Sequence, residues 1–582
     1  MARDHGDIHS RAESGGSITI FMADIEAKKV RGYQLGCAAI LLVLTALFAT
    51  EPDTGYYWVG ADLIRRGLVP YRDFFQFQYP PGAVYLLTPF YGALGNILVQ
   101  RFAFLGVMLV AIWLVFKALA RRQSGWSPFE AFSATVLLLA VSHDFMSDVI
   151  EVDSKTCVAA ASLLVVALLG SADLARRQRD SRVTGAVLVA ACFFVSQKLL
   201  NGFILASSFG CIFVIDAFVA PRWRSRVEGQ AVGSGSVAGS TSGVHRGGAD
   251  SEPVGLLGTL LAALREPSGK KTVVYLAVAA FLCAVCAAVV FISPRLRFQG
   301  FDAVFISLLP VVRFKAINLA RIAWSVLYYY GIPAALLWKL KPKRGWLAEG
   351  EWFWRVGVFV VVYVTVYSFA PPRMHNSYVL APLLSLYALL GIALAQRFQQ
   401  NPKSERTLLL LAPAALLLFT NTFAASQLVP WIFDTHNVSP HGGLYQYAQF
   451  HRIADFIRSH DAELNPDGRR EYRSLRWPQP ILMAGRPASV ATLTGESLLF
   501  IHDPPDPKDR IDKAKALENH ILTWEVLEDL LSDDKSAAWV LEDWEVKYVQ
   551  ERVGTKLSPF STETIARFGR FGLYRLRRGA GK

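Results

Sequence analysis

Two carboxylates, Glu51 and Asp53, are the residues of this chain best placed to do chemistry. They follow the apolar run Gly36–Thr50, which has the character of a membrane span, and they open the aromatic-rich stretch Glu51–Gly82. Carboxylates at a membrane surface are costly unless they pair, bind a metal ion or react. In an extended backbone, residues at this spacing point to one side, so both could hold a divalent cation, or one could accept a proton. The alternative is a pair of solvated loop acids at a helix end. The surrounding aromatics favour an enzyme site where the membrane meets water.

A second acidic stretch, SHDFMSDVIEVD, runs to Asp153. Asp148 and Glu151 have helical i,i+3 spacing, so they could share one helix face and join Glu51 and Asp53 in a metal or proton site. The alternative is a solvated loop in which Asp153 caps the next helix. In that case Asp153 would be structural, while Asp148 or Glu151 could still face the cavity of the proposed site.

Basic residues also occur where the chain is expected to face outward. Lys198 lies between two apolar arms, and Arg373 and His375 stand just before a late apolar run. Arginine grips phosphate through two hydrogen bonds and lysine offers a point charge, so these residues predict a phosphate ligand. The alternative is contact with anionic lipid headgroups.

The composition indicates a membrane protein. The chain has 582 residues, of which 53% are hydrophobic, and a mean hydropathy of +0.31. Taking about 20 residues per span, we expect about eleven transmembrane helices. These are placed near residues 33–50, 100–119, 128–143, 155–171, 183–198, 199–219, 272–292, 319–338, 353–370, 377–396 and 406–424. The apolar segment Pro81–Gly95 is short and contains Pro89, which predicts an interfacial or partly inserted helix.

Every second loop between these spans is basic, as the positive-inside rule requires. This pattern predicts a cytoplasmic tail at residues 1–30 and a transmembrane domain at 31–425. Residues 51–99 then form the first outward loop. The segment 225–258, rich in Gly, Ser and Ala at its centre, is expected to be a flexible cytoplasmic linker.

Residues 430–582 are charged like a soluble protein and predict a small extracytoplasmic α/β domain. Periodicity favours helices at Tyr445–Ser459 and Glu518–Leu531. Short strands are expected at Pro480–Ala484, Ala538–Leu541, Val546–Val549 and Gly572–Arg575.

Several functional classes are disfavoured. The net charge of +13 comes from basic residues between apolar runs rather than on one soluble face, so nucleic acid is not expected as a partner. The six cysteines all lie in apolar runs and are expected to act as small packing residues. The sequence contains no Walker A loop, GxSxG elbow or HExxH motif.

The order of motifs resembles the bacterial integral-membrane glycosyltransferases of the GT-C superfamily. The resemblance lies in the branch related to protein O-mannosyltransferases and aminoarabinose lipid A transferases. Its most specific parts are Asp53, Gly67–Pro70–Tyr71, Asp73 and Tyr79–Pro80–Pro81, and it covers most of residues 30–425. It implies a mostly α, polytopic membrane protein in the inner or plasma membrane.

The resemblance also implies transfer of a sugar from a polyprenyl-phosphate carrier to an envelope glycan, lipid or protein outside the membrane. Asp53 would be the base or would position a metal, with Glu51 beside it and Mg or Mn as the cation. The remaining roles would fall to supporting acids (Asp148, Glu151, Asp153), cations for the donor phosphate (Lys198, Arg373, His375) and a sugar or lipid groove (Tyr57, Tyr71, Asp73, Tyr79). The aromatics could instead form an interfacial belt. The long Gly/Ser insertion and the Glu-Pro before Asp53 depart from the commonest pattern and leave metal use open.

Two other functions fit parts of this pattern. A transporter or flippase of a lipid-linked or anionic substrate could line its pathway with Lys198 and the acids. A non-catalytic membrane scaffold could bind a partner through residues 430–582. Acids concentrated in two outward loops favour the transferase, because a transporter would place more polar groups in the middle of its spans.

Overall fold

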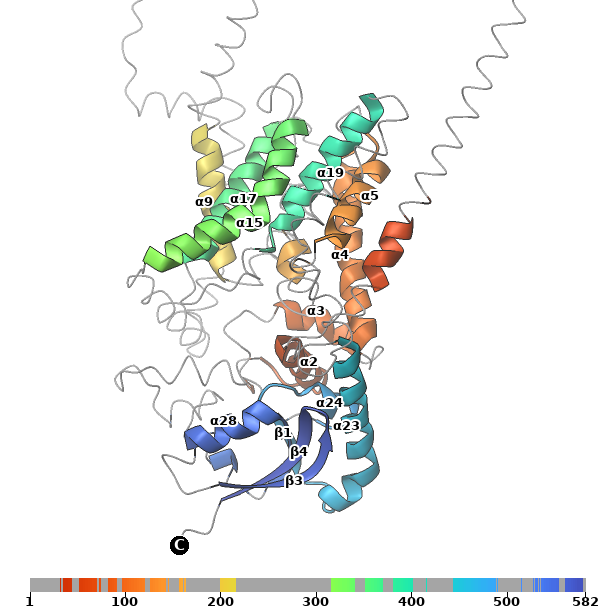
Figure 1. Cartoon of the computed structure of the whole chain (residues 1–582), viewed down its shortest axis with the longest axis vertical. Coiled ribbons are helices and arrows are strands. Elements are labelled where there is room, and N and C mark those ends of the chain that lie inside the picture. Colours follow the sequence, from red (N-terminus) through yellow and green to blue (C-terminus); the bar gives the residue numbers. More distant parts are fainter. Residues whose placement is uncertain are drawn as a thin grey trace, which may run out of the picture.

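The computed structural model is mostly helical, with one small sheet (Figure 1). It describes residues 32, 35–43, 52–70, 73–74, 82–91, 97–120, 126–142, 145, 156–160, 162–163, 199–215, 316–340, 351–369, 380–400, 415, 443–487, 489, 514, 527, 529–531, 533, 535–553 and 560–578.

One group of helices corresponds to the predicted membrane spans. Its members are α4 (Ile97–Ala120), α5 (Pro128–Ala140), α9 (Leu199–Val214), α15 (Ala316–Leu340), α17 (Glu351–Phe369) and α19 (Leu383–Gln400). Each overlaps a predicted span, with ends that differ by a few residues. Within the described part of the chain, only Ile97–Lys117 of α4 is both long and apolar enough to cross a membrane, with a hydropathy of 2.1.

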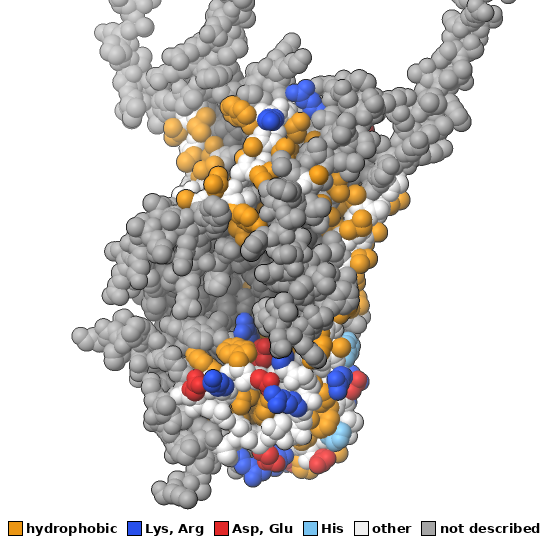
Figure 2. All heavy atoms as spheres, in the orientation of Figure 1, with side chains coloured by type: hydrophobic (Ala, Val, Ile, Leu, Met, Phe, Trp, Pro, Cys, Tyr) orange, Lys and Arg blue, Asp and Glu red, His pale blue; other side chains and the backbone are white. Residues whose placement is uncertain are grey.

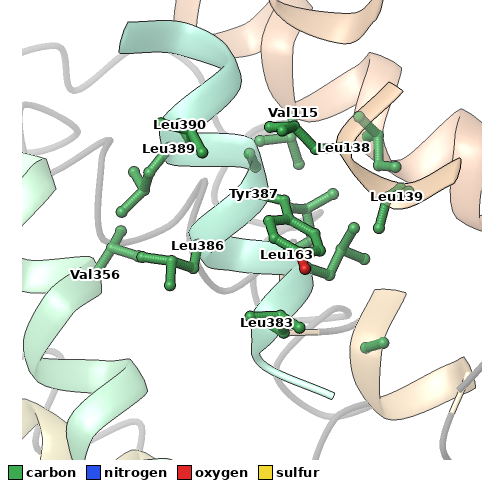
Figure 3. Close-up of a cluster of buried hydrophobic side chains, with 14 of the residues drawn as sticks. Val115, Leu138, Leu139, Leu163, Val356, Leu383, Leu386, Tyr387, Leu389 and Leu390 are labelled. Carbon is green, nitrogen blue, oxygen red and sulfur yellow. The ribbon is translucent and has the colours of Figure 1, made fainter. Parts of the chain in front are cut away.

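Helices α5 and α19 make the closest contact in this group. A Cβ added to Gly391 of α19 would lie 2.2 Å from the Thr135 hydroxyl and 2.7 Å from the Ala131 carbonyl oxygen, both on α5. Glycine therefore allows the two backbones to approach, as small residues do between membrane helices. Tyr387 adds to the contact, because its hydroxyl donates to Ser142 Oγ, just after α5, at 3.0 Å. Figure 3 shows the Tyr387 ring among leucine side chains from both helices.

The C-terminal part contains a four-stranded sheet in the order β1-β2-β4-β3. The strands are β1 (Glu471–Ser474), β2 (Ser536–Glu542), β3 (Phe560–Phe568) and β4 (Phe571–Arg578). β1 pairs with β2 in parallel, while β4 is antiparallel to both β2 and β3. The sheet lies between α23 (Gly443–Leu464) and α28 (Asp543–Val553), as Figure 1 shows.

This α/β region shares a core with the segment that follows the first span. Helices α2 (Pro52–Arg65) and α3 (Gly82–Tyr91) contribute Trp58 and Leu87 to the same cluster of buried side chains as Phe450 of α23, Trp477 and Phe571 of β4. Edge-to-face contacts of Phe450 and Trp477 with Phe571, at 5.3 and 5.7 Å between centroids, fill its centre. Helices α2 and α3 thus share a buried core with the C-terminal sheet.

Two of the predicted strands are wrong. Pro480–Ala484 falls on the short helix α24 (Gln479–Met483), in which proline stands at the start, where helices tolerate it. Val546–Val549 falls on α28, whose first turn carries Asp543 and Glu545 in the place that favours acids. The predicted helix at Tyr445–Ser459 and the strands at Ala538–Leu541 and Gly572–Arg575 are confirmed as parts of α23, β2 and β4.

Several predictions lie wholly or mostly outside the described residues. They are the spans at 155–171, 183–198, 272–292 and 406–424, the linker at 225–258 and the helix at Glu518–Leu531.

Candidate functional site

Asp53 stands in the first turn of helix α2, not in extended backbone. Pro52 begins this helix, since its fixed φ suits the first helical position and its missing N–H costs nothing there. The helix ends in a Schellman motif, in which Gly67 N donates to the Ile64 carbonyl at 2.9 Å and Leu68 N to the Leu63 carbonyl at 3.1 Å. Gly67 has a φ of 87°, a conformation that favours glycine. The predicted extended pair of Glu51 and Asp53 is therefore wrong for Asp53, because a helix begins between the two.

The first turn of α2 is held by residues from far along the chain. The Tyr56 hydroxyl, with the residue 6% exposed, donates to the Leu475 carbonyl oxygen at 2.9 Å. Gly55 lies so close to Gln479 that an added Cβ would be 2.8 Å from three atoms of its side-chain amide. Gln479 is fully buried. Backbone that carries Asp53 is thus docked on the segment that connects β1 to α24.

The remainder of α2 packs against α3. The Trp58 ring meets the Tyr91 ring edge-on at 6.3 Å between centroids, and the Arg65 guanidinium lies 5.3 Å from the centre of that tyrosine ring. Asp62 and Arg66 form an ion pair one helical turn apart. Trp58 and Arg65 thus attach the middle and the end of α2 to α3.

The loop after α2 contains another predicted site residue, Asp73. Its carboxylate accepts a hydrogen bond from Val69 N at 2.7 Å, and its own N–H donates to the Val69 carbonyl at 2.9 Å. Pro70 and Phe74 form an isolated parallel bridge across the same turn. Asp73 thus closes this loop in the structure.

Of the predicted aromatic groove, Tyr57 is the member whose side chain is described. It is 7% exposed and belongs to the core shared by α2 and the sheet. Trp58 and Phe74 are buried in the same core.

The other predicted site residues lie outside the part of the chain that the structure describes. They are Glu51, Tyr71, Tyr79, Asp148, Glu151, Asp153, Lys198, Arg373 and His375, and for Asp53 the backbone alone is described. Among the described side chains, no group of three His, Cys, Asp or Glu residues could hold a metal ion.

The structure adds a buried cation that sequence reasoning did not single out. Arg101, 1% exposed, stands in the first turns of α4, and its Nη1 donates to the Tyr447 hydroxyl on α23 at 2.7 Å. The sequence does mark Arg101 as unusual, because an arginine inside an apolar run is rare and normally has a specific partner. It joins α4 to the C-terminal region.

A second polar cluster lies at the end of β2. Glu542 accepts hydrogen bonds from the indole N–H groups of Trp477 at 3.1 Å and Trp544 at 2.8 Å. Arg570 forms an ion pair with the other carboxylate oxygen at 3.5 Å. This cluster fixes Trp477, which lies between Leu475 and Gln479, the two residues that contact the first turn of α2.

Comparison with known proteins gives matches among solved structures. No family model matches the sequence, and no curated protein is significantly similar to it. ArnT from Cupriavidus metallidurans bound to undecaprenyl phosphate matches with a TM-score of 0.52 at 14% identity, over 95% of this chain and 98% of ArnT. The apo state of the same protein matches with a TM-score of 0.51 at 14% identity, over 94% of this chain and 98% of ArnT. These matches show that the chain has the fold of ArnT, which agrees with the resemblance predicted from the sequence.

Proposed function

We propose that the protein is an integral-membrane glycosyltransferase that moves a sugar from a polyprenyl-phosphate donor to an acceptor outside the membrane. The observation that carries this proposal is the match to ArnT over nearly the whole length of both chains, one structure of which is bound to undecaprenyl phosphate. The position of Asp53 adds support. It opens a helix packed between the apolar helices and the α/β region, where a lipid-borne donor and a water-borne acceptor could meet.

The proposed orientation places the α/β region outside the membrane. Arg101 bonds to α23 at one end of α4, whereas Lys117 lies 16 residues later, about 24 Å along the helix. Basic residues mark the cytoplasmic end of a span. Figure 2 supports this orientation, since charged side chains cover the α/β region and hydrophobic ones dominate the helices above it.

In the proposed reaction, the Asp53 carboxylate accepts the proton of the acceptor hydroxyl. The oxygen of that hydroxyl attacks the anomeric carbon at the same time. The helix dipole favours an ionised carboxylate in the first turn of α2. The bond from the sugar to the phosphate breaks, and the polyprenyl phosphate leaves with the electron pair. A single displacement of this kind inverts the anomeric centre.

The leaving phosphate needs positive charge, which Lys198, Arg373 and His375 would supply. Asp148, Glu151 and Asp153 would orient the acceptor or Asp53, and Tyr71 and Tyr79 would line the groove. In the alternative role, Asp53 with Glu51 would hold a divalent cation such as Mg or Mn, which would neutralise the phosphate further.

The experiment compares envelope glycolipids and glycans, by mass spectrometry, from cells that contain the protein and cells that lack it. We expect at least one species that carries an added saccharide only when the protein is present. Identical spectra would contradict the proposal. Movement of undecaprenyl-phosphate-linked sugar across sealed vesicles, without a new glycosidic bond, would instead indicate a transporter.

A further inference from the structure

The segment Leu475–Gln479 lies beneath the first turn of α2 and contacts it at two points. Tyr56 donates its hydroxyl proton to the Leu475 carbonyl at 2.9 Å, and Gly55 lies against the Gln479 side chain. Tyr56 is three residues after Asp53, so the two share one side of the helix. A contact made by Tyr56 therefore bears directly on the backbone of Asp53.

This segment is itself rigid. Trp477 is 2% exposed, its backbone N–H donates to Ser474 Oγ at 2.7 Å, and its indole N–H donates to Glu542 at 3.1 Å. Two prolines, Pro478 and Pro480, flank Gln479 and restrict its backbone. The α/β region thus presents a fixed surface to α2 rather than a loose loop.

Gly55 shows how closely the two parts fit. The Cβ of any other residue would lie 2.8 Å from the amide carbon, nitrogen and oxygen of Gln479. That amide is the far end of a flexible side chain, but it is fully buried and has no solvent to move into. A methyl group at position 55 must therefore displace Gln479 or the first turn of α2.

We infer that the Leu475–Gln479 segment is a positioning element for Asp53, with Tyr56 as its positioning residue and Gln479 as the side chain that leaves room only for glycine at position 55. This inference rests on the proposed function. The α/β region then acts in catalysis without touching the reacting atoms, by fixing the helix turn from which Asp53 meets the acceptor. Small displacements of a catalytic group reduce rates steeply, whereas they affect binding of the long polyprenyl chain much less.

The test uses the full-length protein in membranes, with product formation normalised to folded protein. Tyr56→Phe removes only the hydroxyl, and we expect it to lower the turnover rate by about tenfold to a hundredfold. Binding of undecaprenyl phosphate should change less than about twofold. The matched control is Tyr574→Phe, which removes a buried hydroxyl that bonds to Asp543 in the α/β region and not to α2. Turnover in the control should stay at the wild-type rate.

A second pair of variants tests the fit at Gly55. Gly55→Ala should lower turnover in the same way, and adding Gln479→Ala should restore part of it by making room for the new methyl group. Hydrogen–deuterium exchange gives a readout independent of activity. Amides of residues 55–59, the first in α2 with an intrahelical acceptor, should exchange faster in Tyr56→Phe, while those of β2 and β4 stay protected.

Equal turnover for Tyr56→Phe and Tyr574→Phe in an active protein would overturn this inference alone. The absence of any rescue by Gln479→Ala would do the same. A wild-type protein that forms no glycosylated product would overturn the proposed function, and this inference with it.

Discussion

Nη1 of Arg101, at the start of α4, donates a 2.7 Å hydrogen bond to the hydroxyl of Tyr447 on α23. The two residues are 346 positions apart, and Arg101 is 1% exposed. A buried guanidinium is costly unless its donors are satisfied. This bond therefore couples α4 to the region that carries the sheet.

Tyr447→Phe should lower the free energy of unfolding by about 1–3 kcal/mol, because a buried charged donor loses one hydrogen-bond acceptor. Thermal unfolding of the purified protein in detergent measures the change. Tyr85→Phe is the control, since Tyr85 is 50% exposed on α3 and its loss should leave the melting temperature unchanged. The same melting temperature in both variants would show that the bond adds nothing to stability.

The close contact of α5 and α19 makes Gly391 the most sensitive glycine of the described helices. Gly391→Ala should destabilise the protein, by about 1–3 kcal/mol, because the new methyl group meets backbone and the Thr135 hydroxyl. The measurement is the midpoint of thermal aggregation in detergent.

Gly106→Ala in α4 provides the matched control. A Cβ at Gly106 meets nothing within 4 Å, so alanine there should be neutral or slightly stabilising through its higher helix propensity. If the two variants aggregate at the same temperature, the α5–α19 contact is looser than described.

The apolar helices could be predicted from sequence because their signal is local. Long runs such as Ile97–Ala120 and Glu351–Phe369 need no partner to be recognised. Strands β2 and β4 could also be predicted, since buried apolar residues dominate SAAWVLE and part of FGLYRLRR. Boundaries differ by a few residues in both directions, because hydrogen bonding rather than hydropathy decides where a helix begins and ends.

The errors occurred where local pattern and tertiary packing disagree. VKYV alternates like a strand, but acids in the first turn and packing against β2 and β3 make it part of α28. The stretch PDTGYYWVGADLIR contains two glycines and reads as a loop, yet Tyr56 and Trp58 bury against other elements and hold it as α2.

For the candidate site, the sequence could locate Asp53 and the order of the surrounding motifs. It could not reveal what holds Asp53, because the Tyr56–Leu475 contact joins residues 419 positions apart. A single sequence carries no trace of such a pairing when the acceptor is a backbone carbonyl. Arg101 was visible as an anomaly, but its partner Tyr447 was not.

Tyr574 predicts a specific response to alkaline pH. Burial, and then the neighbouring Asp543 carboxylate, raise the pKa of Tyr574 to about 12 from its ordinary value of 10.0. The unfolded chain therefore loses this proton at lower pH than the folded one. The stability that Tyr574 contributes is complete below about pH 10 and is lost as the pH rises towards 12.

Tyr574→Phe should consequently be less stable than wild type at pH 8, by about 0.5–1.5 kcal/mol for the lost hydrogen bond to Asp543. This difference should shrink between pH 10 and 12, because only the wild type contains Tyr574 and loses its contribution to stability as the pH rises. Urea titrations at pH 8 and pH 11.5 measure it. A difference that stays constant with pH would contradict the assignment.

Asp53→Asn tests the proposed chemistry most directly. The amide keeps the size of the side chain and the first turn of α2 but cannot accept the acceptor's proton. Transfer should fall by about 10²- to 10⁴-fold, the usual contribution of a general base, whether or not a metal ion also uses this carboxylate. The measurement is the yield of the saccharide-bearing species per amount of folded, membrane-inserted protein.

Asp455→Asn is the control, since the Asp455 side chain is 66% exposed on α23. Among the ion pairs of the described residues, Asp455 pairs only with a neighbour on its own helix. Full activity in Asp53→Asn would remove Asp53 from the mechanism, whereas equal losses in both variants would point to a general effect of removing an acid.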